Sequence, residues 1–262
     1  MGINTTFPKW LSLMKRRHGV DLSTVCMLGR QNMADIPLES WREDLSAYFD
    51  VSKILQPDGY AESFWRQLAG SDDAKIDSVD YSNYEGANII LDLNEPLPEE
   101  HHGRWSAVYD GGTLEHVFNY PQALRNAMCM VRLGGHLFLA TITNGFCNHG
   151  FYQFSPTLFF SIFVEENGYR LLDMTAVKGK SPAWRLNWDH GRYIPNFGRG
   201  GEMQGMYDLL VCAERIGDVP ETLRPYQRFF VERWTGAAGG GGGAWCEEYD
   251  LDAALKAATN VS

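Results

Sequence analysis

The sequence predicts an α/β protein built on a seven-stranded, mostly parallel sheet that is flanked by helices. Short apolar runs rich in β-branched and aromatic residues alternate along the chain with segments of helical periodicity. Several of these runs end on Gly or Asp, which is typical of buried parallel strands. The 262 residues, 44% of them hydrophobic, can bury one full core, so we expect one domain with elaborations rather than two large domains.

The expected strands follow one another with helices between them. They span residues 24–28, 76–80, 87–91, 105–109, 136–142, 169–177 and 206–216. A helix over 120–131 precedes the fifth strand, and a helix over 156–167 begins at Ser155-Pro156. Because such alternation implies right-handed crossovers, the first five strands should all end at the same edge of the sheet.

The connection after the first strand is unusually long. It contains helical patterns over 38–50 and 60–69, and its length far exceeds the ~20 residues of a simple dinucleotide-binding unit. We interpret residues 34–70 as an inserted helical cap. An N-terminal helix within residues 1–22 should end at Gly19.

The main domain is predicted to span residues 23–217, and within it the segment 179–205 has no clear periodicity and is interpreted as a lid. Residues 218–262 are expected to form a tail, with short helices over 226–234 and 250–258 around a glycine-rich linker. Deleting the chain from Gly239 onward should therefore leave its thermal stability nearly unchanged.

Composition argues against several partners. The net charge of -10 offers no basic surface for nucleic acid. No apolar stretch approaches the ~20 residues of a membrane span, and no signal peptide is visible, so we expect a cytoplasmic protein without a membrane partner. The five cysteines stand singly, without metal-ligand spacing. Nothing in the sequence determines the oligomeric state.

In an open α/β sheet the ligand binds outside the carboxyl ends of the strands. A ligand with an adenosine half needs close backbone approach after the first strand, an acid for its ribose after the second, and hydrogen bonds to adenine after the third. Gly29, Asp80 and the pair Asp92-Leu93 stand at these three positions.

The segment after residue 104 carries a specific resemblance. The run Trp105-Ser-Ala-Val-Tyr-Asp-Gly-Gly-Thr-Leu-Glu-His116 resembles the fourth-strand segment of class I, Rossmann-like S-adenosylmethionine-dependent methyltransferases. Val131-Arg-Leu-Gly-Gly-His-Leu137 is similar to that family's R-x-L-x-P-G-G turn without its proline. The likeness runs from about Thr24 to Ile216 and is strongest between Asp77 and Ile142.

This resemblance implies a Rossmann-like fold, S-adenosylmethionine as the cofactor, and cofactor contacts at the strand ends. The residues expected there are Gly29, Arg30, Gln31, Asp80, Tyr81, Asp92, Leu93, Asp110 and Gly111. Where the family has an acid followed by spaced glycines, this chain has Met27, Gly29, Gln31 and Met33. Because a side chain replaces the second glycine, either Arg30 and Gln31 reshape the loop or cofactor binding is weaker.

Methyl transfer from a sulfonium is an in-line displacement, so the protein mainly positions the acceptor and removes its proton. His149, which follows the fifth strand, is the first candidate for the base and His116 is the second; Asp189-His190 comes next. Tyr152, Trp184, Trp188 and His190 are candidates for the acceptor pocket, although Trp184 and Trp188 could equally be core residues on one helical face.

Asn144, Asn148 and His149 could instead help to bind a divalent ion, but no carboxylate cluster accompanies them in sequence, so no metal is expected.

Three functions remain in competition. The first is methylation of a hydroxyl on a small molecule such as a sugar or secondary metabolite, which fits the acidic surface, the aromatic residues and the histidines. The second is a catalytically silent protein that kept the fold and binds a cofactor or a partner, which the altered glycine loop supports. The third is a nucleotide-dependent oxidoreductase, against which the absence of G-x-G-x-x-G speaks.

Overall fold

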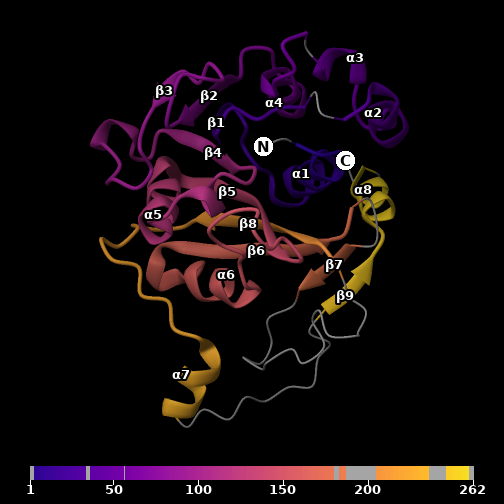
Figure 1. Ribbon diagram of the computed structural model, residues 1–262. Coiled ribbons are helices and arrows are strands. Elements are labelled where there is room, and N and C mark those ends of the chain that lie inside the picture. Colours follow the sequence, from indigo (N-terminus) through magenta and orange to yellow (C-terminus); the bar gives the residue numbers. More distant parts are fainter. Residues whose placement is uncertain are drawn as a thin grey trace.

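The computed structural model describes residues 3–33, 36–55, 57–179, 183–186, 205–235 and 246–259. These residues form one nine-stranded sheet with helices on both faces (Figure 1). The strands are β1 (Thr24–Leu28), β2 (Lys75–Asp80), β3 (Ile89–Ile90), β4 (Trp105–Asp110), β5 (Val131–Asn144), β6 (Tyr169–Val177), β7 (Ala183–Leu186), β8 (Tyr207–Arg215) and β9 (Cys246–Tyr249).

The strand order is β3-β2-β1-β4-β5-β8-β6-β7-β9. The five strands from β3 to β5 pair in parallel, whereas β8 runs antiparallel to β5 and β6, and β7 runs antiparallel to β6 and β9. The predicted fold class, a Rossmann-like sheet flanked by helices, is confirmed, with nine described strands in place of seven. The order reverses between β1 and β4, which is where ligands bind in sheets of this kind.

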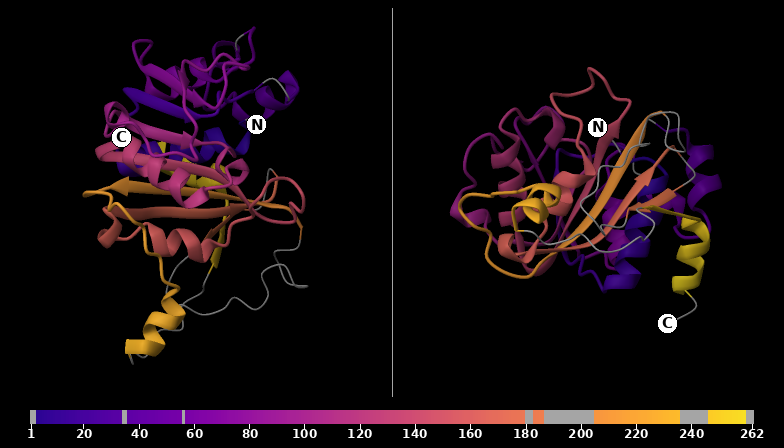
Figure 2. Two further views of the ribbon diagram at one scale, coloured as in Figure 1. Left: turned by 60° about the vertical axis from the view of Figure 1, so that its left-hand side comes forward. Right: turned by 90° about the horizontal axis from the view of Figure 1, so that it is seen from below.

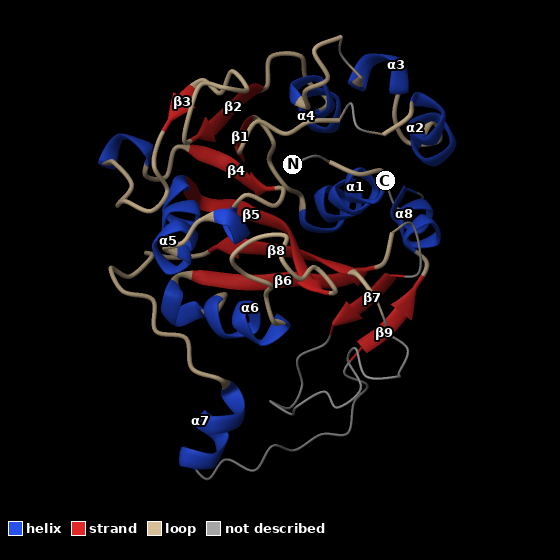
Figure 3. Cartoon of the chain, viewed as in Figure 1, coloured by secondary structure: helices blue, strands red, loops and turns tan. Residues whose placement is uncertain are grey.

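The helices form two layers around the sheet (Figure 3). They are α1 (Thr6–His18), α2 (Leu38–Leu45), α3 (Val51–Ile54), α4 (Glu62–Ala69), α5 (Tyr120–Met130), α6 (Pro156–Ile162), α7 (Arg228–Thr235) and α8 (Leu251–Thr259), with 3₁₀ turns η1 (Glu99–His101), η2 (Leu114–His116) and η3 (Glu165–Asn167). Helices α5 and α6 share a core with Cys26 and Leu28, and helices α1 to α4 and α8 share one with Val25 and Met27. Alternate residues of β1 thus face opposite layers, as the pleat of a strand requires.

The helices between β1 and β2, in the segment predicted as an inserted helical cap, belong to this second layer and pack on the sheet. Trp41 of α2 and Trp65 of α4 are fully buried, and the Trp65 ring lies 5.2 Å from the ring of Tyr109 in β4. Tryptophans at these positions supply the apolar contact that a helix needs to cover a sheet. The long connection therefore contributes core rather than a separate lobe.

The C-terminal residues also differ from the expected tail. Strand β9 pairs with β7 along its whole length, and α8 lies beside α1, where Lys9 contacts Asp252 at 2.9 Å. Leu255 of α8 is fully buried. The expectation that everything after Gly239 is dispensable therefore conflicts with these contacts; Gly239 to Gly243 themselves lie outside the described residues.

Helix α7 stands away from the sheet (Figure 2, left), and Trp234 on it is 69% exposed. The expected N-terminal helix is present as α1 and ends where predicted, at Gly19, whose φ of 62° is the left-handed conformation common at helix ends. Among the described residues, each helix is too short or too polar to span a bilayer.

Candidate active site

The carboxyl ends of β1 and β4 meet at two glycines, Gly29 and Gly111. A Cβ on Gly29 would lie 2.7 Å from Thr113 Oγ1, and a Cβ on Gly111 would overlap the carboxamide of Gln31. The space above these glycines, here called the glycine cradle, is therefore filled by the side chains of Gln31 and Thr113. Gln31 Nε2 donates to the carbonyl oxygens of Leu28 at 2.8 Å and Gly29 at 3.2 Å.

Gln31 thus replaces the second glycine of the family pattern with a side chain that folds back onto β1. The residue is 1% exposed, and its Oε1 has no hydrogen-bond partner among the described residues. A buried carbonyl oxygen without a donor is unfavourable by about 1–3 kcal/mol. Rotating the carboxamide into solvent would satisfy that oxygen, so this side chain is a displaceable occupant of the glycine cradle.

Arg30 is held on the helical side of the same loop. Its guanidinium pairs with Asp58 at 3.0 Å and Glu62 at 2.7 Å and lies 3.9 Å from the ring centre of Tyr60. The Arg30 side chain therefore ties the β1 loop to the segment that leads into α4.

The two acids at the ends of β2 and β3 differ in their contacts. Asp80 is half-buried, and its carboxylate makes no hydrogen bond or ion pair with any other described residue. Asp92 instead accepts from the backbone N–H of Asn94 at 2.9 Å and from its side chain at 2.8 Å, and these bonds lower the pKa of Asp92. Asp80 is available to a ligand, whereas Asp92 caps a turn.

Of the neighbouring predicted residues, Tyr81 is 74% exposed at the surface and Leu93 is buried in the core beneath α5.

Two buried carboxyls lie behind the β4 end. Asp110 Oδ1 accepts from the backbone N–H of Thr113 at 2.8 Å and of Leu114 at 3.3 Å, and its Oδ2 has no partner among the described residues. Glu115, fully buried in η2, accepts from Thr141 Oγ1 at 3.2 Å through Oε2. Burial raises the pKa of Glu115 to about 7, and burial together with the charge of Glu115 raises the pKa of Asp110 well above its usual range.

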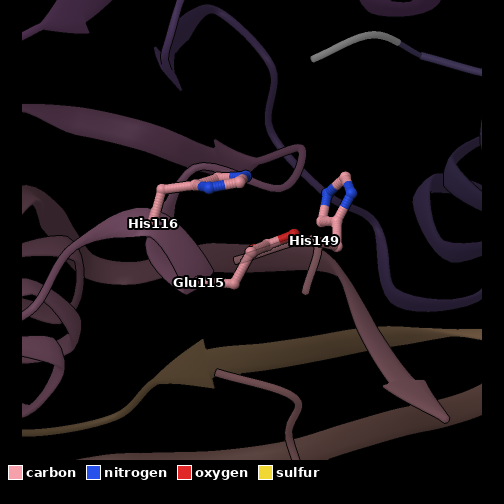
Figure 4. Close-up of side chains that lie close together, drawn as sticks. All are labelled: Glu115, His116 and His149. Carbon is pink, nitrogen blue, oxygen red and sulfur yellow. The ribbon is translucent and has the colours of Figure 1, made fainter. Parts of the chain in front are cut away.

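The two candidate bases are neighbours in space (Figure 4). The rings of His116 in η2 and His149 after β5 lie 5.2 Å apart, and both residues are exposed. Burial and the charge of His149 lower the pKa of His116. The β5 loop is fixed to η2 because the carbonyl oxygen of Glu115 accepts from Phe151 N at 2.9 Å and Tyr152 N at 3.3 Å.

The structure places the aromatic candidates differently from one another. Tyr152 donates its hydroxyl to the carbonyl oxygen of Phe118 at 2.6 Å, close to η2. Trp184 lies in strand β7 rather than on a helix and is 4% exposed, packed against Tyr207 in the core. Its expected place in an acceptor pocket is thus not supported by its burial. Trp188, Asp189 and His190 lie outside the described residues.

Sequence reasoning did not group Glu115 with the two histidines. Its side chain lies between the two histidines in the close-up, with one ligand atom from each of the three residues within 4.8 Å of the others (Figure 4). The sequence carried one available signal: Glu115 and His116 follow β4 directly and His149 follows β5, so adjacent strand ends bring them together.

No family model and no curated protein matches the sequence. Among solved structures, the chain is similar to the 1,6-didemethyltoxoflavin-N1-methyltransferase of Burkholderia thailandensis, with 11% identity over 81% of this chain and 79% of that one and a TM-score of 0.45. It is also similar to the branched-chain polyamine synthase of Thermus thermophilus, with 14% identity over 84% of this chain and 58% of that one and a TM-score of 0.42.

A third similar structure is an S-adenosylmethionine-dependent methyltransferase of Aquifex aeolicus, with 10% identity, 80% and 98% coverage and a TM-score of 0.39. At these values the activity of the chain has to be derived from its own residues. Its own strand order and its two helical layers give it the Rossmann-like α/β fold that the sequence predicted for a class I methyltransferase.

Proposed function

We propose that this chain binds S-adenosylmethionine at the carboxyl ends of β1 and β4 and transfers the methyl group of this cofactor to a small-molecule acceptor. The observation that carries the proposal is the free, half-buried carboxylate of Asp80 at the end of β2. Strand β2 pairs with β1, and Gly29 at the end of β1 borders the glycine cradle. A carboxylate in this position can accept both hydroxyls of a ribose. The cofactor fits once the Gln31 carboxamide rotates out of the glycine cradle.

When bound, the cofactor supplies an electrophilic methyl group on a sulfonium. The chain's own residues have three tasks: Asp80 orients the ribose, the β1 and β4 ends hold the remainder of the cofactor, and the edge near His116 and His149 receives the acceptor. Holding the two reactants in line is the main source of rate in such a displacement. For a hydroxyl acceptor, His149 is the first candidate to take the proton and His116 the second.

The cofactor test is a calorimetric titration with S-adenosylhomocysteine. Asp80→Asn should weaken binding by about 1–3 kcal/mol, which is roughly 5- to 150-fold, because a charge-assisted hydrogen bond is lost. Asp92→Asn is the matched control and should leave affinity within about twofold, since Asp92 is engaged by Asn94. Absence of binding to the unaltered protein at millimolar ligand would refute the proposal.

The acceptor we propose is a hydroxyl-bearing small molecule such as a sugar or secondary metabolite. Support comes from the exposed histidine pair at the β4 and β5 ends and from the net charge of -10, which disfavours nucleic acid. Sugars and phenols should be screened for methylation with a labelled methyl donor. With the acceptor found, His149→Ala should lower turnover by about 100- to 10,000-fold and leave S-adenosylhomocysteine affinity within a factor of a few.

One observation favours the alternative of a catalytically silent protein, namely the glycine cradle filled by Gln31. If the Gln31 side chain stays in the glycine cradle, the cofactor cannot approach the β1 backbone. A silent protein that binds a partner in place of the cofactor would show no saturable S-adenosylhomocysteine binding at this site and no response to Asp80→Asn, whereas a silent protein that keeps the cofactor would bind it and methylate nothing in the acceptor screen.

A further inference from the structure

We propose that Glu115, His116 and His149 form a binding site for one divalent transition-metal ion. The carboxylate comes from η2, one imidazole from the residue that follows it, and the other from the loop after β5 (Figure 4). One ligand atom from each side chain lies within 4.8 Å of the other two. Two imidazoles and one carboxylate are a ligand set that zinc and ferrous iron take in proteins.

The site can close around an ion without movement of the main chain. Metal–ligand bonds of about 2.0–2.2 Å in tetrahedral geometry place the donor atoms about 3.3 Å apart, so the present distances between them must shrink by at most about 1.5 Å. His116 and His149 are exposed and can turn their rings by that amount, whereas Glu115 is fully buried and stays in place. The hydrogen bond from Phe151 N to the Glu115 carbonyl oxygen keeps both loops together.

The second observation is an unsatisfied oxygen. Glu115 Oε1 is buried and has no hydrogen-bond partner among the described residues, although Oε2 of the same carboxylate is bonded to Thr141. Buried polar atoms in native proteins are nearly always paired, and an ion is one recognised partner for those that are not. The two histidine rings lie on the solvent side of this carboxylate, so an ion between them would complete its coordination.

Three protein ligands leave at least one coordination position open towards solvent, as catalytic rather than structural metal sites do. An oxygen of the acceptor could occupy that position, where the ion would lower the pKa of the acceptor hydroxyl and take over the task that His149 has in the metal-free site, since a ligating imidazole nitrogen cannot accept the proton. This catalytic consequence rests on the proposed methyl transfer, whereas ion binding itself does not and is tested separately.

The experiment is equilibrium dialysis of the tag-free full chain against Zn²⁺, with bound metal measured by elemental analysis, and a parallel titration with Co²⁺ followed by its visible absorption. We expect one ion per chain and a tetrahedral or five-coordinate cobalt spectrum. His116→Ala and His149→Ala should each weaken Zn²⁺ binding at least tenfold, and Glu115→Gln at least as much. The histidine variants change exposed residues, so circular dichroism should show them folded even if Glu115→Gln is not.

Two control variants define the site. Cys147→Ser removes an exposed thiol two residues before His149, and His102→Ala removes an exposed imidazole elsewhere on the chain. Both should bind Zn²⁺ as the unaltered protein does. The proposal is overturned if the unaltered protein binds no ion, or if His116→Ala and His149→Ala bind it undiminished.

The same samples are titrated with S-adenosylhomocysteine. Zinc binding without S-adenosylhomocysteine binding would refute the methyltransferase function and leave the metal site standing. S-adenosylhomocysteine binding without zinc binding would refute the metal site and leave the methyltransferase function standing.

Discussion

Single side chains decide whether the space at the carboxyl end of β1 is open to a ligand, and Gln31 is the clearest case. Its carboxamide fills the glycine cradle and donates to two main-chain carbonyl oxygens. Entry of the cofactor requires these hydrogen bonds to break, at a cost of about 0.5–1.5 kcal/mol each.

Gln31→Gly should therefore strengthen S-adenosylhomocysteine binding by about five- to a hundredfold, because the bonds no longer have to be broken and the cradle is already open. Isothermal titration calorimetry measures the change. Gln31→Met is the control, since it fills a similar volume and should give no such gain. A weaker affinity in Gln31→Gly would mean that the carboxamide contacts the ligand.

Three of the predicted cofactor contacts were chosen because they stand at strand ends. Gly29 follows β1, Asp110 is the last residue of β4 and Gly111 follows it, and both strands have clear apolar patterns. The roles of Asp80 and Asp92 could not be separated in advance, because the difference lies in the Asn94 side chain, whose bond to Asp92 depends on local turn geometry. The grouping of Glu115 with His149 was not foreseen because His149 is 34 residues away and meets Glu115 only through the pairing of β4 with β5.

At the scale of elements, strand β9 and helix α8 are the least expected parts of the fold. The residues of β9, Cys246–Tyr249, include two adjacent glutamates and show no apolar alternation, as befits an edge strand. Its partner β7 has only four residues, so neither strand could be recognised without the other. Strands β1, β4 and β5 were predictable because each buries an apolar run between two helical layers.

Ending the chain before Cys246 should lower the melting temperature by about 6–24 °C. The deletion removes the β7–β9 ladder and the buried side chains of Leu251 and Leu255, each worth about 1.5–3 kcal/mol, and about 2–4 °C follows from each kcal/mol in a chain of this size. Differential scanning calorimetry provides the measurement.

Leu255→Ala tests the same contact without truncation and should cost about 2–5 kcal/mol, whereas exposed Lys256→Ala should be neutral. A truncated chain that melts with the intact one would show that α8 adds no stability.

The stability of the whole molecule should depend on pH through the carboxyl group of Asp208 in the sheet. Burial raises the pKa of Asp208 in β8 from 3.8 to about 6. The folded state therefore favours the protonated form of Asp208. The contribution of Asp208 to the free energy of unfolding is most favourable below about pH 4 and is lost as the pH rises to about 6. Asp208→Asn should thus raise the free energy of unfolding at pH 7 by about 1–3 kcal/mol.

Urea unfolding at pH 4, 5, 6 and 7 gives this comparison. The gain from Asp208→Asn should grow between pH 4 and 6 and then level off. Asp72→Asn, at an exposed position before β2, is the control and should shift the curve little. A gain that is equal at pH 4 and pH 7 would show that ionisation of Asp208 does not oppose folding.

The contact between α1 and α8 has a consequence for the order of events on the ribosome. Helix α1 is synthesised well before α8, which begins at Leu251 and packs beside it. At about 5–20 residues per second, the nascent chain carries the α8-facing side of α1 uncovered for on the order of tens of seconds. Strand β9 is synthesised just before α8, so the α1–α8 and β7–β9 contacts form only after these two elements have been made, and cellular chaperones have that interval in which to bind the chain.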